Sequence, residues 1–136
     1  MGLFTTKPIT SYTTITFRIS GMRLTSEYEI TSKDGTSEIS EYYYYCAQGG
    51  GMERRLERST SCPDEEMLKL LNDCEAMKWN GFHGKHPHGV QDGEMFSFKA
   101  TVNGGEVIEA DGSANFPKHF SEFRREIGRM LYESAS

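Results

Sequence analysis

The sequence predicts an α+β protein with a single antiparallel sheet of about six strands, in the chain order ββββ-α-ββ-α, and two helices packed on one face. Two patterns predict it. Apolar and polar residues alternate through the first 60 residues and again near residue 100, as in half-buried strands. Two other segments repeat apolar residues every three or four positions, as in amphipathic helices. A chain of 136 residues suits one domain, predicted at 1–136 with a loosely ordered segment at 1–12.

The first half of the chain predicts a four-stranded meander. Ile15, Phe17 and Ile19 alternate with polar residues, so one face of this strand is buried. Asp34-Gly35 is typical of a tight hairpin turn, because this pair tolerates positive φ angles. The four strands are predicted near residues 14–19, 24–30, 36–46 and 52–58.

The first helix is predicted from Cys62-Pro63-Asp64 to about Trp79. Proline suits the first helical turn, and acidic residues there complement the helix dipole. Its apolar face is formed by Met67, Leu70, Leu71, Cys74 and Met77. Residues 80–93 lack periodicity and are rich in glycine and histidine, which predicts a long loop.

A hairpin and a second helix complete the prediction. Strands at residues 96–102 and 106–110 flank Asn103-Gly104, which is a strong hairpin signal. A turn at Asp111-Gly112-Ser113 leads to a helix with Pro117 near its first turn. The apolar stripe of this helix is formed by Phe116, Phe120, Phe123, Ile127, Met130 and Leu131.

Glycine turns and aromatic residues follow one another in the second half of the chain. They are Trp79-Asn80-Gly81-Phe82, Asp92-Gly93, Phe96, Gly112-Ser113 and Phe116-Pro117. This run resembles small uncharacterised bacterial α+β proteins with a W-x-G-F … D-G-x-x-F … G-S-x-x-F-P pattern. The resemblance implies a bacterial origin and supports the hairpin followed by a helix. Those proteins have no known activity, so the resemblance identifies neither an activity nor a catalytic residue in this chain.

Charge and cysteine content limit the partners and the compartment. The 20 acidic residues outnumber the 15 basic ones, whereas nucleic-acid binders usually carry a basic balance, so no nucleic-acid partner is expected. No apolar stretch is long enough for a membrane span, and no membrane partner is expected. Three scattered cysteines are poor material for a disulfide framework, which favours a reducing, cytoplasmic location.

The run Tyr42-Tyr43-Tyr44-Tyr45 is the most unusual local feature. In a strand, Tyr43 and Tyr45 face one side with Ile39 and can enter the core, while Tyr42 and Tyr44 face the other side. The second pair then lies on an open sheet face. There it forms either an ordinary half-exposed strand surface or an interface.

The interface interpretation leads to the main functional hypothesis. Tyrosine and arginine are enriched at binding hot spots, so we expect an interaction surface that includes Tyr42, Tyr44, Arg55 and Glu57. The protein is then a non-catalytic module whose partner is a second copy of itself or another protein. An inhibitor or accessory factor also fits its small size and acidity.

The alternative is a metal-binding or small-ligand-binding domain, which can include an enzyme, centred on the histidine-rich loop. His83, His86 and His88 lie close together in sequence, and imidazole is a common ligand of divalent transition metals. Cys74, Asp92 or His119 could complete such a site. The spacing matches no standard zinc pattern, so a solvated loop without a cofactor remains the competing interpretation.

Cys62 is the candidate reactive thiol. It precedes a predicted helix, where the helix dipole lowers the pKa of an exposed thiol.

Overall fold

The computed structural model describes residues 7–89 and 93–135. The elements follow the predicted order with one short strand added. They are β1 (Tyr12–Ser20), β2 (Thr25–Lys33), β3 (Thr36–Cys46), β4 (Met52–Pro63), α1 (Asp64–Asp73), the 3₁₀ helix η1 (Ala76–Trp79), β5 (His83–Gly84), β6 (Met95–Val102), β7 (Glu106–Ser113) and α2 (Phe120–Ala135).

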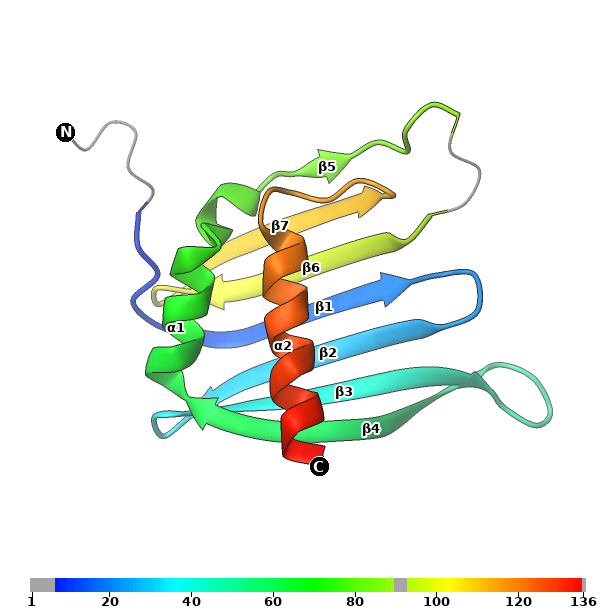
Figure 1. Ribbon diagram of the computed structural model, residues 1–136, viewed down its shortest axis with the longest axis horizontal. Coiled ribbons are helices and arrows are strands. Elements are labelled where there is room, and N and C mark those ends of the chain that lie inside the picture. The colour runs from blue at the N-terminus through cyan, green and yellow to red at the C-terminus, as the bar shows by residue number, and fades with distance from the viewer. Residues whose placement is uncertain (1–6, 90–92, 136) are drawn as a thin grey trace.

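One sheet runs through the molecule in the order β4-β3-β2-β1-β6-β7-β5. Strands β1 to β4 form the predicted antiparallel meander, and β6 pairs with the other side of β1. Both helices cross the same face of the sheet (Figure 1). The α+β class with helices on one face is therefore confirmed, and the other face of the sheet is covered by no described element.

The prediction of an entirely antiparallel sheet is wrong, because β5 pairs in parallel with β7. The segment after η1 follows the edge of β7: the Gly81 amide donates to the Glu109 carbonyl (2.8 Å), and the Asp111 amide donates to the Phe82 carbonyl (3.0 Å). The Glu109 amide donates to the Asn80 side chain (3.0 Å). Residues 80–84 thus cover one edge of the sheet, a position predicted to be loop.

Strand β7 also runs three residues further than predicted, through Asp111 to Ser113. Its pairing with β6 continues to Met95 and Ser113, so these residues are not a turn. Gly112 is required here because the chain crosses directly over it. A Cβ at this position would lie 2.1 Å from the Asn115 carbonyl oxygen.

Both helices are shorter than their apolar patterns predict. Helix α1 ends at Asp73, because Glu75 adopts a left-handed backbone (φ 55°), and η1 then continues to Trp79. Helix α2 begins at Phe120, after His119 with φ 70°. Phe116 packs against the core from the segment before the helix rather than from its first turn.

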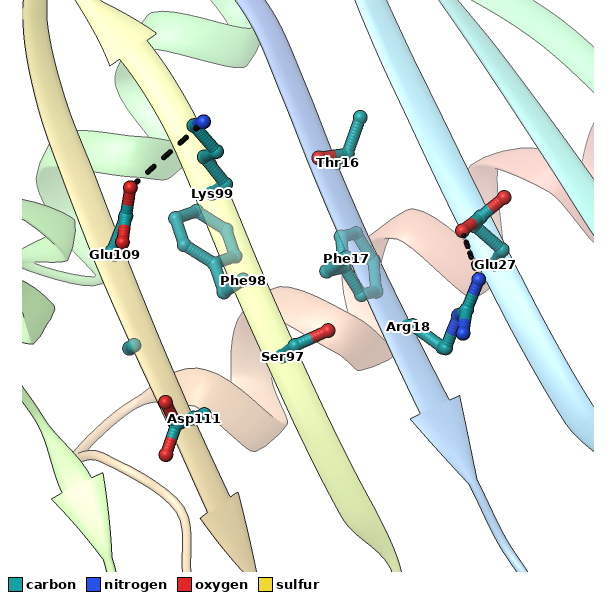
Figure 2. A pocket seen from close by; sticks show the side chains of 10 residues that line it. Thr16, Phe17, Arg18, Glu27, Ser97, Phe98, Lys99, Glu109 and Asp111 are labelled. Carbon is teal, nitrogen blue, oxygen red and sulfur yellow. Dashed lines mark hydrogen bonds and ion pairs between the residues drawn. The ribbon is translucent and has the colours of Figure 1, made fainter.

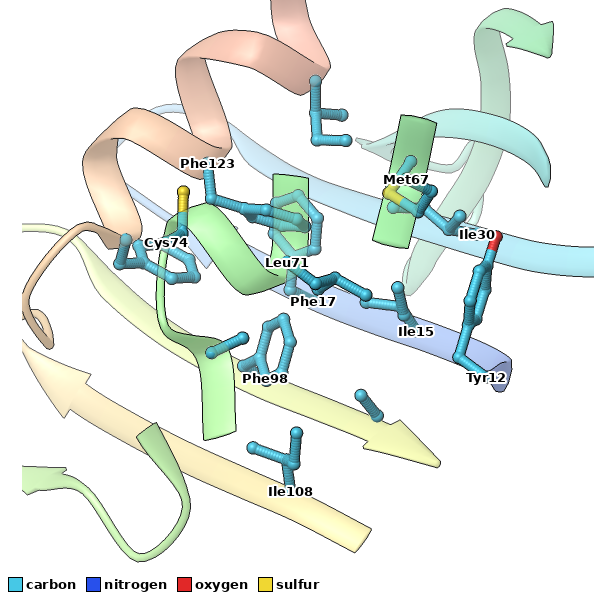
Figure 3. Packing of buried hydrophobic residues seen from close by; sticks show 14 of the residues in the cluster. Tyr12, Ile15, Phe17, Ile30, Met67, Leu71, Cys74, Phe98, Ile108 and Phe123 are labelled. Atoms are coloured by element: carbon cyan, nitrogen blue, oxygen red, sulfur yellow. The ribbon is translucent and has the colours of Figure 1, made fainter. Parts of the chain in front are cut away.

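The core lies between the sheet and the two helices (Figure 3). Its centre is aromatic: Trp79 meets Phe98 edge-on with ring centroids 5.1 Å apart, and Phe17 contacts Phe123 at 5.6 Å. The Trp79 indole N–H donates to the Lys118 carbonyl (2.9 Å), which satisfies the polar atom of this buried ring. The few aliphatic residues of the chain thus suffice because large rings fill the core.

A buried polar chain fixes the start of α1. The Tyr12 hydroxyl donates to Ser37 Oγ, and Ser37 donates to Asp64 Oδ1 (2.6 Å). Burial raises the pKa of Tyr12 to about 12, although the hydrogen bond to Ser37 acts in the opposite direction. Ser37 is completely buried. Its hydrogen bonds with Tyr12 and Asp64 connect β3 to β1 and to α1.

Side chains from elsewhere in the fold hold residues 8–10 of the predicted loose segment. The Asn72 side chain accepts from the Ile9 amide (2.8 Å) and donates to the Ile9 carbonyl (2.9 Å). Asn103 accepts from the Thr10 amide (2.8 Å). Ile9 itself is 2 % exposed, so this part of the segment belongs to the core.

Candidate interaction surface

The face of the sheet opposite the helices is mostly polar and rich in hydroxyl groups, and its exposed apolar side chains are Met52, Leu56, Met95 and Val107. Its side chains come from alternate positions of each strand, so they form rows across the sheet. One row runs from Asp111 on β7 through Ser97, Arg18 and Glu27 to Tyr42 on β3. Figure 2 shows the part of this face on β2, β1, β6 and β7, with the helices behind the sheet. We call the whole face of the sheet opposite the helices the open face.

Arg54 and Tyr42 form the closest cation–π pair on the open face. The Arg54 guanidinium carbon lies 3.9 Å from the centroid of the Tyr42 ring. Nη1 of the same guanidinium donates to Glu27 Oε1 (2.8 Å) and Glu29 Oε1 (2.6 Å). The side chain is thus fixed by one ring and two carboxylates.

Arg18 and Tyr44 form a second pair beside the first. The Arg18 guanidinium carbon lies 4.9 Å from the Tyr44 ring centroid, and Nη2 donates to the Tyr44 hydroxyl (2.9 Å) and to Glu27 Oε2 (3.0 Å). The Tyr44 hydroxyl donates to Glu27 Oε1 (3.1 Å). Burial by itself would raise the pKa of Glu27, but the bonds from Arg54, Arg18 and Tyr44 hold it below its ordinary value.

These contacts define a single connected group, which we call the Tyr–Arg cluster. It consists of Arg18, Glu27, Glu29, Tyr42, Tyr44 and Arg54. Two arginines and two glutamates balance each other in charge. A surface of this kind is preorganised, since its long side chains are already ordered before any partner arrives.

The structure divides the four predicted surface residues between two faces. Tyr42 and Tyr44 belong to the Tyr–Arg cluster, whereas Arg55 and Glu57 contact Tyr45 on the helix-bearing side. The Arg55 guanidinium lies 4.7 Å from the Tyr45 ring centroid, and the Tyr45 hydroxyl donates to Glu57. A β-bulge causes this division: Arg58 pairs with Glu41 and Leu56 with Tyr42, which leaves Glu57 as an extra residue.

Tyr43 and Tyr45 also differ from expectation, because both are only half-buried and stand outside the core. Between Ile39 and Tyr43 on this side of β3 lies Glu41, which is buried at 4 % exposed. Glu41 accepts from the Tyr28 hydroxyl (2.8 Å) and from Arg58 Nη1 (2.8 Å). Burying a charge is costly unless the charge is hydrogen-bonded, and these two donors meet that requirement for the Glu41 carboxylate.

A shallow hollow of about 370 Å³ lies on the open face between Arg18 on β1 and Asp111 on β7 (Figure 2). Lys99 and Glu109 stand at its margin with their charged atoms 3.9 Å apart. Asp111 is paired with His83 Nδ1 at the sheet edge, and the two line a second hollow of about 440 Å³. Carboxylates therefore dominate the β7 side of the open face.

The three histidines of the loop have separate surroundings. His83 pairs with Asp111, His86 Nδ1 lies 2.9 Å from Ser113 Oγ, and His88 is exposed. Within residues 7–89 and 93–135, no three His, Cys, Asp or Glu side chains are grouped as a metal site.

Among the described residues, the side chains expected to complete a metal site are not gathered around the loop either. His119 contacts Glu75 and Glu122. Cys74 is buried. Asp92 lies outside the described residues.

Cys62 is buried, so the condition for a reactive thiol is not met. Burial, followed by the nearby charges of Glu66 and Asp64, raises the pKa of Cys62 to about 11. The dipole effect expected at the start of α1 is thus outweighed by desolvation. Cys46 is the exposed thiol among the three.

The comparisons with known proteins give no family assignment. No protein-family model matches the chain, and no curated protein shows significant sequence similarity to it. Among the described residues, neither helix combines the length and the apolar character needed to cross a membrane. Function is therefore inferred from the geometry of the open face and of the β7 edge.

Proposed function

We propose that the protein is a non-catalytic interaction module that forms a homodimer through its open face. The observation that carries this proposal is the Tyr–Arg cluster around Tyr42 and Tyr44. Tyrosine and arginine are the residue types most enriched at binding hot spots. Because the cluster is ordered and charge-balanced in advance, a partner that covers it orders few additional side chains.

The distribution of charge across the open face supports a second copy as the partner. Arg54 of β4 stacks on Tyr42 of β3, while the exposed carboxylates Glu109 and Asp111 lie on β7, at the other side of β1. A two-fold axis along β1 places β3 of each copy opposite β7 of the other, so the Arg54 guanidinium on Tyr42 faces the β7 carboxylates of the other copy. Such an isologous arrangement repeats each favourable contact twice.

The middle of the open face favours close approach of two sheets. Thr14 and Thr16 of β1 and Ser97 and Thr101 of β6 carry short hydroxyl side chains on this side. These groups carry no charge, so covering them costs far less than burying an unpaired ion. Two sheets can therefore pack face to face, which in sandwiches occurs at a spacing of about 10 Å.

Light scattering coupled to size-exclusion chromatography tests the proposal over a wide range of protein concentration. We expect a dimer that becomes monomeric on Tyr42→Ala or Tyr44→Ala. Tyr132→Ala is the matched control, because Tyr132 is 61 % exposed on the helix-bearing side. A monomer at every concentration, or a dimer lost only with Tyr132→Ala, would exclude a homodimer formed through the open face.

A small-ligand site at the β7 edge is the second candidate function. The specific observation is the pairing of His83 with Asp111, since a carboxylate partner fixes the orientation of an imidazole ring beside a hollow. Replacing His83 by alanine separates the two candidates. The homodimer should persist in this variant, whereas binding of a small ligand at the hollow should be lost.

A further inference from the structure

A groove of about 430 Å³ lies on the helix-bearing side of the molecule, and side chains from both α1 and α2 line it. The two helices cross the same face of the sheet (Figure 1). Among the described residues, ion pairs of the lining side chains stay on one helix and none joins α1 to α2. Lys69 pairs with Asp73 (2.6 Å), and Glu126 accepts from Arg129 Nε (2.8 Å). We call this space the helix groove.

The floor of the helix groove is apolar. It is formed by Leu70 of α1, by Cys74 directly after α1 and by Met130 of α2. Met67 and Leu71 of α1 are fully buried in the core, whereas Leu70 is only half-buried. The apolar stripe of α1 is thus wider than the part that the sheet covers, and its outer part lies in the groove. Methionine has a flexible side chain that adapts to different partners, which suits Met130 to a binding surface.

The margins of the helix groove carry more negative than positive charge. The carboxylates that line it belong to Glu66, Asp73, Glu122 and Glu126, and the cations to Lys69 and Arg125. Burial, followed by the charges of Glu122, Asp73 and Glu126, raises the pKa of Cys74 to about 11, so this negative field reaches the floor. Because complementary charges steer and orient partners, a surface with positive charges beside apolar side chains matches the groove.

We propose that the helix groove binds an amphipathic helix of another protein, with apolar side chains against Leu70 and Met130 and lysine or arginine along its flanks. Recognition of a helix in a groove uses apolar anchors spaced three or four residues apart. The groove of about 430 Å³ falls within the range of roughly 300–1,000 Å³ that is typical of ligand pockets. It therefore accommodates a few anchoring side chains, while the rest of the bound helix lies above the margins.

A second copy of the chain matches the helix groove less well. The chain has a net charge of −5, and like charges across an interface oppose association. The open face lies on the opposite side of the sheet from α1 and α2, so the groove stays accessible in the proposed homodimer. The helix groove is therefore a separate surface, and a dimer would present two of them.

Fluorescence anisotropy with a labelled synthetic peptide measures binding to the full chain. The probe is a peptide of about 18 leucine and lysine residues, which is long enough to form a helix and carries all leucines on one face. We expect one peptide per chain and a lower affinity at high salt. A scrambled peptide of the same composition, and a peptide with glutamate in place of lysine, should each bind at least about tenfold more weakly. Equal binding of the scrambled peptide, or no binding of the probe, would overturn the proposal.

Glu66→Lys and Glu65→Lys form a matched pair of variants. Both residues are exposed in the first turn of α1, but of the two only Glu66 lines the groove. We expect Glu66→Lys to weaken binding of the probe about fivefold or more, and Glu65→Lys to change it less than about twofold. Equal effects of the two substitutions would contradict binding in the groove. A change of oligomeric state in Glu66→Lys, measured by light scattering, would also overturn the proposal, because the groove would then be a contact between copies.

Nuclear magnetic resonance of the methionine methyl groups locates the probe without any substitution. Adding the peptide should shift the signal of Met130 in the groove floor and leave that of Met52, which is 59 % exposed on the open face, unchanged. A shift of Met52 in place of Met130 would place the peptide on the open face and overturn the proposal.

Discussion

The Arg54 guanidinium carbon lies over the Tyr42 ring, 3.9 Å from its centroid, while the same guanidinium bridges Glu27 and Glu29. Hydrogen bonds to Glu29 and Glu27 raise the pKa of Arg54 above its ordinary value. One side chain thus connects β4 to β2 over the intervening strand β3. This arrangement gives the open face an ordered surface of aromatic rings and paired charges.

Replacing Arg54 by lysine tests this arrangement. Lysine keeps the charge but loses the planar group that stacks on Tyr42 and bridges two carboxylates. Because Arg54 is partly exposed, we expect the free energy of unfolding in urea to fall by less than about 1 kcal/mol. Dimer formation should weaken clearly in the same variant. Arg129→Lys on α2 is the control, and equal dimerisation of the two variants would contradict the role of Arg54.

Ser37→Ala should destabilise the fold without affecting the open face. Ser37 is fully buried and links the Tyr12 hydroxyl to Asp64, so alanine leaves buried polar groups without a partner. Such a loss typically costs about 1–3 kcal/mol, measurable by chemical denaturation. Ser40→Ala on the open face should change stability by less than about 0.5 kcal/mol. Similar losses in the two variants would show that the buried chain of hydrogen bonds is unimportant.

Acid should weaken the contact between Glu94, which precedes β6, and Arg124 of α2. Arg124 donates to both carboxylate oxygens of Glu94 (2.9 and 3.0 Å), and these bonds lower the pKa of Glu94 from its ordinary value of 4.5. A lowered pKa in the folded state stabilises the protein above pH 4.5, and this contribution is lost as the pH falls through the folded value. Glu94→Gln should therefore be less stable than the natural chain at pH 7, with a smaller difference at pH 3. A difference that grows on acidification would contradict this assignment.

Thiol reactivity should be confined to Cys46 in the folded protein. Burial raises the pKa of both Cys62 and Cys74 to about 11, and neither is exposed. A thiol reagent at pH 8 should modify one cysteine in native protein and three after denaturation, as counted by mass spectrometry. Cys46→Ser should abolish the native reaction. Labelling of Cys62 at a comparable rate would show that the start of α1 opens readily.

The meander and the two helices could be predicted because their signals are local. Ile15, Phe17 and Ile19 alternate within β1, and Asp34-Gly35 specifies the hairpin between β2 and β3 without reference to distant residues. Strand β5 has only two residues, and it pairs because Gly81 and Phe82 bond to β7. Periodicity cannot reveal a strand of this length, since its pairing depends on the packed edge of the sheet.

The Tyr–Arg cluster was predictable in part. The side of β3 that carries Tyr42 and Tyr44 follows from strand alternation, and this expectation agrees with the structure. The arginine partners depend on the register of β4, and the bulge at Glu57 changes which residues lie on each face. Arg18 was identifiable in principle, because it lies on the polar face of the first predicted strand. Its contact with Tyr44 could be predicted only from the way β2 pairs with both β1 and β3.

The most direct test of the proposed homodimer is the distance between two copies of one residue on the open face. Thr16 lies on β1 along the proposed two-fold axis, so a nitroxide label on Thr16→Cys, in the Cys46→Ser background, meets its own copy across the interface. Because packed sheets lie about 10 Å apart, pulsed electron resonance should show a short distance between the labels. A label at Glu65→Cys on the outer side of α1 should show a much longer one. No dipolar coupling at Thr16→Cys, or the shorter distance at Glu65→Cys, would contradict association through the open face.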